Sequence, residues 1–170
     1  MTAEEIRSAL EAAGAASNDT DYAKSGTHVD ATVPADRLRD VVQVLRDSEF
    51  LIEDLSAVDA SPQMMGLYHF CRVDVACRVT LRALTDREAP ELPSIQDIYP
   101  GANWHEREAH DFYGIVFTGH PDLSPLILPE DDEGTCPLRK NEKKLKALVD
   151  VIPLFAPAAP EAADSSEGEA

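Results

Sequence analysis

The residue types best suited to chemistry in this 170-residue chain are crowded between positions 105 and 122. Imidazole and carboxylate side chains follow one another closely there: His105, Glu106, Glu108, His110, Asp111, His120 and Asp122. Nitrogen and oxygen ligands of these kinds bind zinc and non-haem iron, and the same groups act as general acids and bases. One hypothesis is therefore a stand-alone metal-dependent hydrolase that uses the His/Asp/Glu cluster at 105–122.

The spacing of the histidines argues against that hypothesis. The run HEREAH separates His105 from His110 by five positions, which puts the two rings on different sides of a helix. A zinc-binding His-Glu-x-x-His motif instead brings its two histidines to one face. We therefore assign no catalytic residue and no metal ligand from the sequence.

A short helix is expected to hold most of the cluster. Asn103 with Glu106 three positions later fits a capping box, and Gly114 supplies the left-handed residue that ends a helix. Glu108 and Asp111 lie three positions apart on one face, where bases elsewhere in the chain would meet them. A structural role for these acids is therefore the alternative to a role in catalysis or metal binding.

Other enzyme signatures are not found in the sequence. It contains no Gly-x-Gly-x-x-Gly motif, no phosphate-binding loop and no Gly-x-Ser-x-Gly elbow. The three cysteines lack Cys-x-x-Cys spacing, and an iron–sulfur cluster typically takes four thiolates. Four neighbouring aromatic residues are interpreted as core and interface anchors: Trp104, Phe112, Tyr113 and Phe117. On the residues alone, a binding module is favoured over an enzyme.

The rest of the chain predicts an α+β domain. Helical periodicity, capped at Thr2 and again beginning at Pro34, predicts helices over 2–14 and 34–48. Alternating apolar residues predict strands at 28–33 and 77–84, and apolar, β-prone composition predicts strands at 50–58 and 67–75. Polar and turn-forming residues predict loops at 17–26 and 59–66. We expect a two-layer domain with a mixed β-sheet and helices mainly on one face, followed by an extended Pro-rich C-terminal arm.

Proline shapes the chain beyond Gly119. The prolines exclude regular structure and predict an arm held by contacts with another protein. One last helix is expected at 140–151, and the basic run there is either a docking edge or a solvated face. Three regions result: an α+β domain at 1–118, an arm and basic segment at 119–152, and a disordered acidic tail at 153–170, which binds a basic partner or nothing.

Charge and hydropathy limit the partners. The chain has 32 acids against 15 bases, a net charge of −17, which argues against nucleic acid as a partner. The acidic N-terminus does not look like a signal peptide, and no stretch approaches the ~20 apolar residues that cross a bilayer. Unpaired cysteines fit a reducing cytoplasm. We expect this chain to reach a membrane only through partner subunits.

The stretch from 94 to 140 closely resembles the 30 kDa subunit, or C subunit, of respiratory complex I. This family of NADH dehydrogenase subunits is shared with the equivalent subunit of membrane-bound energy-converting [NiFe] hydrogenases. The matching positions are Ala102, Asn103, Trp104, Glu106, Glu108, Asp111, Gly114, Ile115, Phe117, Gly119, His120, Pro121, Asp122, Leu123, Gly134, Pro137, Leu138, Arg139 and Lys140. From residue 28 a looser likeness follows the family's order of strand, helix and hairpin.

Two departures from the family pattern favour a hydrogenase-type relative over the quinone-reducing type. Ser124 and Pro125 stand where the family commonly has two arginines, which removes two cations that could pair with a partner's acids. Asn141 and Glu142 replace the Asp-Tyr that often follows Pro-Leu-Arg-Lys.

The resemblance implies a cofactor-free accessory subunit in the peripheral arm of such a complex, on the cytoplasmic face of the inner or plasma membrane. Its partners would be the large subunit (49 kDa, or hydrogenase large) and the small iron–sulfur subunit. Iron–sulfur clusters, and in hydrogenases a [NiFe] site, would belong to those partners. The segment from Gly119 to Lys140 is expected to clamp onto the large subunit. The expected docking residues are Trp104, Glu106, Glu108, Asp111, Phe117, His120, Asp122, Arg139 and Lys140.

Overall fold

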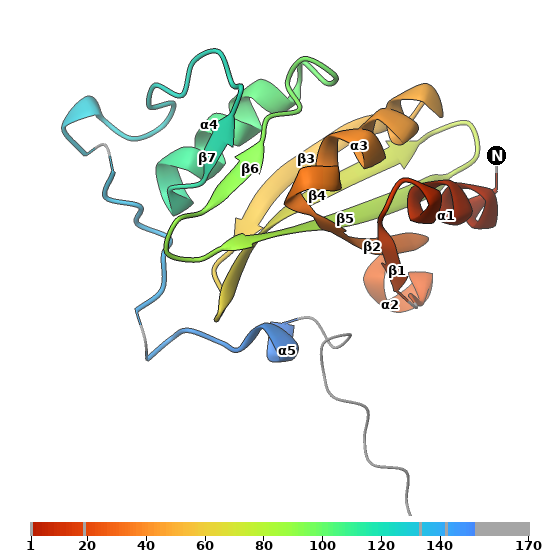
Figure 1. The fold of residues 1–170 in the computed structure, drawn as a ribbon, viewed down its shortest axis with the longest axis horizontal. Coiled ribbons are helices and arrows are strands. Elements are labelled where there is room, and N and C mark those ends of the chain that lie inside the picture. The colour runs from red at the N-terminus through yellow and green to blue at the C-terminus, as the bar shows by residue number, and fades with distance from the viewer. Residues whose placement is uncertain (1, 19, 133, 142, 152–170) are drawn as a thin grey trace, which may run out of the picture.

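A computed structural model shows a five-stranded sheet with its helices mainly on one face (Figure 1). The structure describes residues 2–18, 20–132, 134–141 and 143–151. The strands, in spatial order, are β1 (Ala16–Asn18), β2 (Val29–Pro34), β5 (Cys77–Asp86), β4 (Gln63–Arg72) and β3 (Leu51–Val58). β2 and β5 are parallel and the other neighbours are antiparallel. The predicted α+β class with a mixed sheet is confirmed.

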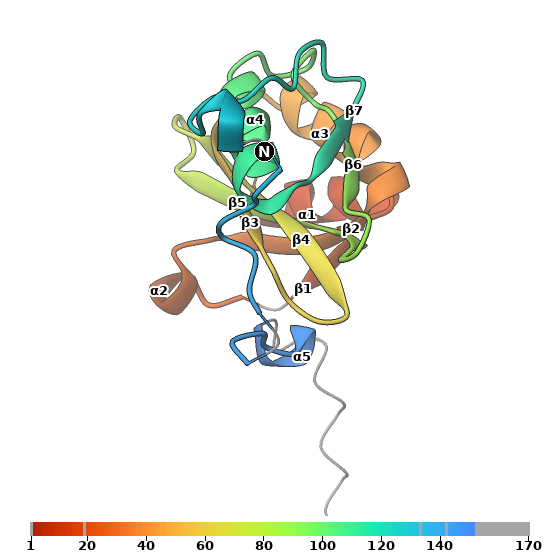
Figure 2. The same ribbon diagram turned by 90° about the vertical axis from the view of Figure 1, so that its left-hand side faces the viewer.

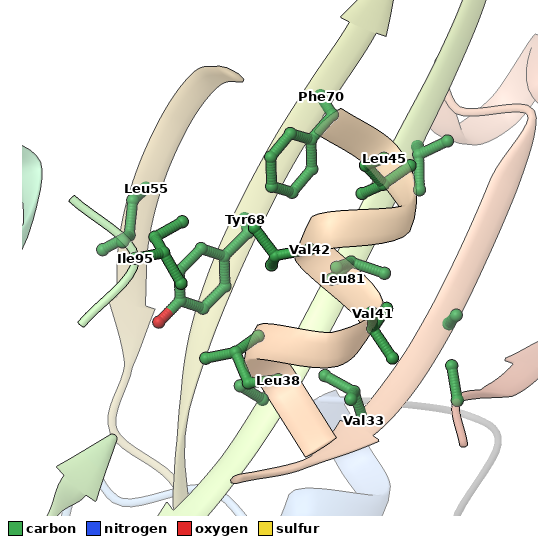
Figure 3. Close-up of a cluster of buried hydrophobic side chains, with 14 of the residues drawn as sticks. Val33, Leu38, Val41, Val42, Leu45, Leu55, Tyr68, Phe70, Leu81 and Ile95 are labelled. Atoms are coloured by element: carbon green, nitrogen blue, oxygen red, sulfur yellow. The ribbon is translucent and has the colours of Figure 1, made fainter. Parts of the chain in front are cut away.

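Apolar side chains of two helices cover one face of the sheet. α1 (Ala3–Ala12) begins at the predicted capping box of Thr2 and Glu5, and α3 (Leu38–Asp47) follows the short helix η1 (Ala35–Arg37). The inward residues of α1 and α3 are Ile6, Leu10, Leu38, Val41, Val42 and Leu45. Figure 3 shows the α3 residues packed over Tyr68, Phe70 and Leu81 of the sheet. This burial is the main source of stability for the fold.

A two-stranded parallel sheet lies beside the main one (Figure 2). It pairs β6 (Glu91–Pro93) with β7 (Val116–Thr118), and it buries Leu92 and Phe117 completely or nearly so. In the sequence, α4 (Ala102–Tyr113) lies between these two strands, and it packs against β3. Phe117, interpreted from the sequence as a core or interface anchor, is the central residue of β7 and packs into the core.

Several local predictions are wrong. The expected loop at 17–26 contains the end of β1 and the short helix α2 (Tyr22–Ser25), because β1 has only three residues and shows no alternation to detect. The expected turn at 59–66 is too long, because β4 already begins at Gln63. The strand expected to end at residue 84 continues to Asp86. Pro34 closes β2 instead of opening the helix.

After Gly119 the described chain forms only two short helices, η2 (Glu130–Asp132) and α5 (Leu148–Val151). The predicted helix over 140–151 is wrong except for its end. At that end, Leu148 packs against Ala60 and Met65 on the other face of the sheet. The predicted acidic tail lies outside the described residues. No helix within the described ranges is long and apolar enough to cross a membrane.

Gly66 lets the small sheet approach the large one. A Cβ atom on Gly66 would lie 2.9 Å from Cδ1 of Leu92 and 3.0 Å from the ring of Tyr68. We expect Gly66→Ala to lower the free energy of unfolding by about 1–3 kcal/mol through overpacking, measured by urea denaturation. Ser56→Ala, at an exposed position of β3, is the control and should change it by less than about 0.5 kcal/mol. Equal stability of the two variants would contradict this tight contact.

Candidate functional site

α4 begins without the capping box expected from the sequence. Gly101 occupies the N-cap with no side-chain hydrogen bond, and Asn103 already lies in the helix. The C-terminal end agrees with the prediction, since Gly114 adopts φ 74° and its N–H donates to the carbonyl of His110. The expectation that Glu106 caps its own helix is wrong. Its side chain is turned into the protein instead.

Glu106 holds the turn that follows β6. Its side chain is fully buried, and its two carboxylate oxygens accept hydrogen bonds from Ser94 Oγ at 2.6 Å and from the Ile95 N–H at 2.8 Å. Arg39 of α3 donates to the Ser94 carbonyl and forms a bidentate pair with Asp97 at 2.8 and 2.6 Å. The carboxylate therefore binds the turn in the way an N-cap residue binds the first turn of a helix.

Burial sets the acidity of Glu106. Desolvation raises its pKa from the ordinary 4.5 to about 7, although the donors from Ser94 and Ile95 act in the opposite direction. Nε2 of His120 lies 3.9 Å from the Glu106 carboxylate, and the His120 side chain is enclosed as well. That nitrogen has no hydrogen-bond partner among the described residues. With a pKa of about 7, Glu106 changes its protonation near neutral pH.

Asp111, one turn further along α4, holds the segment after Gly119. A single carboxylate oxygen accepts the backbone N–H groups of Leu126, Ile127 and Leu128 at 2.9, 2.8 and 3.2 Å. Burial acts to raise the pKa of Asp111, but the three donors outweigh burial and leave the pKa below its ordinary value. Three charge-assisted bonds on one atom fix the course of a segment that has no regular structure.

Arg107 holds the same segment two residues earlier. It donates to the carbonyl of Ser124 at 3.0 Å, to the Ser124 hydroxyl at 3.2 Å and to the carbonyl of Pro125 at 2.9 Å. Asp122 closes the turn by accepting the N–H of Ser124 at 2.9 Å. The backbone at 124–128 is therefore bound to α4 by side chains of both charges.

A third buried carboxylate, which the sequence analysis did not single out, fixes the chain near residue 140. Asp59 is fully buried and accepts from Arg87 Nε at 2.7 Å and from the Lys140 N–H at 2.7 Å. Arg87 also donates to the Lys140 carbonyl at 3.0 Å, and Arg139 donates to the Arg87 carbonyl. The sequence predicts only a turn at Asp59, and nothing local links it to residues about eighty positions away.

The nine expected docking residues lie in three kinds of environment. Glu106, Asp111 and Phe117 are buried in the chain's own interior. Four others make hydrogen bonds within the chain: His120, Asp122, Arg139 and Lys140. Trp104 and Glu108 remain exposed on α4. These two line a groove with five other residues: Pro100, Gly101, His105, Leu126 and Ile127.

The three histidines of the polar cluster are not brought together. Nδ1 of His105 lies 3.4 Å from Asp54 of β3, while Nδ1 of His110 lies 2.9 Å from the carbonyl of Ile115. His120 is enclosed in the interior. Within the described ranges, no group of three or more His, Cys, Asp or Glu side chains is arranged to hold a metal ion. The arrangement expected for a metal-dependent hydrolase at 105–122 is therefore not formed.

The fold and this site define a mixed α+β domain whose charged residues hold irregular backbone. Residues 31–147 match the family model of the respiratory-chain NADH dehydrogenase 30 Kd subunit. The match covers well over half of the chain, and the chain belongs to that family.

Similar proteins agree with this assignment. The C subunit of NADH-quinone oxidoreductase from Roseiflexus sp. (strain RS-1) is 40% identical over 116 residues, 64% of this chain and 66% of the relative. The C subunit of F(420)H(2) dehydrogenase from Methanosarcina mazei is 35% identical over 122 residues, 69% of this chain and 77% of the relative. The alignment thus spans about two thirds of the length of the first relative.

Two solved structures share the fold. A chain of the membrane-bound sulfane sulfur reductase, an archaeal respiratory membrane complex, has a TM-score of 0.70 and 26% identity over 98% of both chains. A trypsin-resistant fragment of Nqo5 has a TM-score of 0.62 and 25% identity, over 72% of this chain and all of the fragment.

Protonation of Glu106 makes the stability of the fold depend on pH. Because folding raises this pKa, the folded chain binds the proton more tightly, and its contribution to stability is lost as pH rises from about 4.5 to about 7. Glu106→Gln keeps an acceptor for Ile95 and does not titrate. Relative to this variant, the wild type should lose on the order of 3 kcal/mol across that window, at about 1.4 kcal/mol per pKa unit. Urea denaturation at several pH values measures it, and parallel profiles for the two proteins would contradict it.

Removal of the Asp111 carboxylate should release the segment at 126–128. Thermolysin cleaves before large apolar residues, so cleavage at Leu126, Ile127 or Leu128 shows that this segment has been released from α4. We expect Asp111→Ala to be cleaved there about tenfold faster or more, because three charge-assisted bonds are lost. Asp122→Ala loses one exposed bond and is the matched control. Equal cleavage of both variants would show that Asp111 does not hold the segment.

Proposed function

We propose that this chain is an accessory subunit of a complex I-type NADH-quinone oxidoreductase or of a related membrane-bound respiratory complex. It assembles there with the large catalytic subunit and with the small iron–sulfur subunit, and it carries no redox group of its own. Membership in the 30 Kd subunit family supports this proposal. So does the likeness to a chain of a respiratory membrane complex over nearly its whole length.

The observation that supports the accessory role is that the buried carboxylates bind the chain's own backbone. Glu106 and Asp111 accept backbone N–H groups of neighbouring segments, and Asp59 does the same for Lys140. Carboxylates bound in this way are acceptors held in fixed positions. They shape a surface, while proton and electron transfer would take place in the partner subunits.

In this proposal the docking surface consists of α4, which belongs to the domain at 1–118, and of the segment 119–152 that follows it. The bonds to Arg107 and Asp111 give residues 124–128 of that segment a defined course before any partner binds. The segment would then serve as the clamp on the large subunit. Contact with a membrane would be made by the partners, at the cytoplasmic face.

Purification of the chain from its own cells tests this proposal. With an affinity tag on the full chain, mild detergent extraction of membranes should recover it together with a large subunit and an iron–sulfur subunit in equal amounts. Mass spectrometry identifies the partners, and electron paramagnetic resonance should show iron–sulfur signals in the complex and none in the isolated chain. Recovery of the chain alone, or stoichiometric zinc or iron bound to the isolated chain, would contradict the proposal.

A further inference from the structure

The groove on α4 has the size and composition of a recognition site. Its volume is about 670 Å³, within the range of ligand-binding clefts. One wall is formed by α4 and the turn before it, and the other by the segment after Gly119. The apolar lining residues are Pro100, Trp104, Leu126 and Ile127, and the polar ones are His105 and Glu108.

Two large apolar side chains of this groove are left in solvent. Trp104 is 69% exposed and Ile127 is 55% exposed, although both belong to segments that are held firmly in place. A tryptophan loses little conformational entropy on binding and buries a large area, which is why exposed tryptophans act as anchors in protein interfaces. The pair is well placed to receive an apolar side chain from another protein.

The groove is formed before any partner arrives. Arg107 and Asp111 bind the backbone of residues 124–128 from one side of α4. Trp104 and Glu108, each three positions earlier, form the adjacent stripe that faces the groove. A partner would therefore not have to order this wall, which lowers the entropic cost of binding.

The charge of the groove selects the partner. The carboxylate of Glu108 is exposed and has no hydrogen bond or ion pair with any residue of the described chain. The other carboxylate nearby, Asp54, lies 3.4 Å from His105. In a chain of net charge −17, a free carboxylate beside an apolar surface favours an occupant that brings a cation.

We infer that this groove receives a segment of a partner protein in which a large apolar side chain is flanked by arginine or lysine. The apolar side chain packs between Trp104 and Ile127, and the cation pairs with Glu108. This inference rests on the proposed function, because the partner meant is another subunit of the same complex. It goes further by assigning the contact to one groove and by defining the chemistry of the segment that fills it.

Rebinding of the full chain to complex from which it has been removed tests the inference. Trp104→Ala should weaken binding about 30-fold or more, as expected of an interface anchor. Glu108→Gln should weaken it several-fold and reduce its dependence on salt, and Glu108→Lys should weaken it further. Val73→Ala, at an apolar position that is 77% exposed in the β4–β5 turn, and Glu11→Gln, at an exposed position of α1, are the matched controls and should bind like the wild type. Urea denaturation should show that all these variants are as stable as the wild type.

The outcomes separate the two proposals. If the wild type rebinds and Trp104→Ala and Glu108→Lys rebind equally well, the groove is not the contact, and the proposed function stands. Failure of the wild type to rebind would instead contradict the proposed function. A photo-crosslinking residue at position 104 should label a partner segment with adjacent apolar and basic residues. Labelling of a segment without a base, or a Trp104-dependent dimer of this chain seen by light scattering, would overturn the inference.

Discussion

Backbone N–H groups outside helices and strands need acceptors, and in this protein buried carboxylates supply several of them while backbone carbonyls supply others. Glu106 accepts from Ile95, Asp111 accepts from residues 126–128, and Asp59 accepts from Lys140. Each bond joins an irregular segment to the packed domain. An unpaired buried carboxylate or N–H would cost far more than such a bond contributes, so the arrangement holds only when all partners are in place. The course of the chain after Gly119 depends on it.

These bonds give a structural task to a cluster that is rich in catalytic residue types. The acids on α4 have different roles because their side chains point in different directions. Glu106 and Asp111 point inward and hold backbone, while Glu108 points to solvent and has no partner among the described residues. The held segment in turn places Leu126 and Ile127 opposite Trp104. No group of three or more His, Cys, Asp or Glu side chains in the described ranges is arranged to hold a metal ion. Trp104, Ile127 and the exposed carboxylate of Glu108 instead form a surface with an apolar centre and one free charge.

Much of the fold follows from local pattern. The periodicity of α3 predicts its buried face correctly, and Gly114 marks the end of α4, because both signals depend on residues within a few positions of each other. The site follows from local pattern only in part. Glu106 satisfies the spacing of a capping box with Asn103, yet its partners lie eleven and twelve positions earlier, in a turn that only the folded chain brings near.

The missed contacts share one cause. Asp59 and Lys140 are 81 positions apart, and the group that Asp59 binds is a backbone N–H, which every residue but proline carries. No residue type in a sequence marks such a donor. The family resemblance points to Arg139 and Lys140 but not to the residues that bind them. The structure shows that Arg139 binds Arg87 and that Lys140 binds Asp59.

The claim that buried carboxylates form the recognition surface in advance is tested most directly by hydrogen exchange of the free, unmodified chain. The amides of Leu126, Ile127 and Leu128 lie in a segment without helix or strand, where exchange at the rate of an unstructured peptide is the default. The account predicts that all three are protected in the isolated chain, to the extent of their bonds to Asp111. Exchange at the unstructured rate, with protection gained only in the assembled complex, would contradict it.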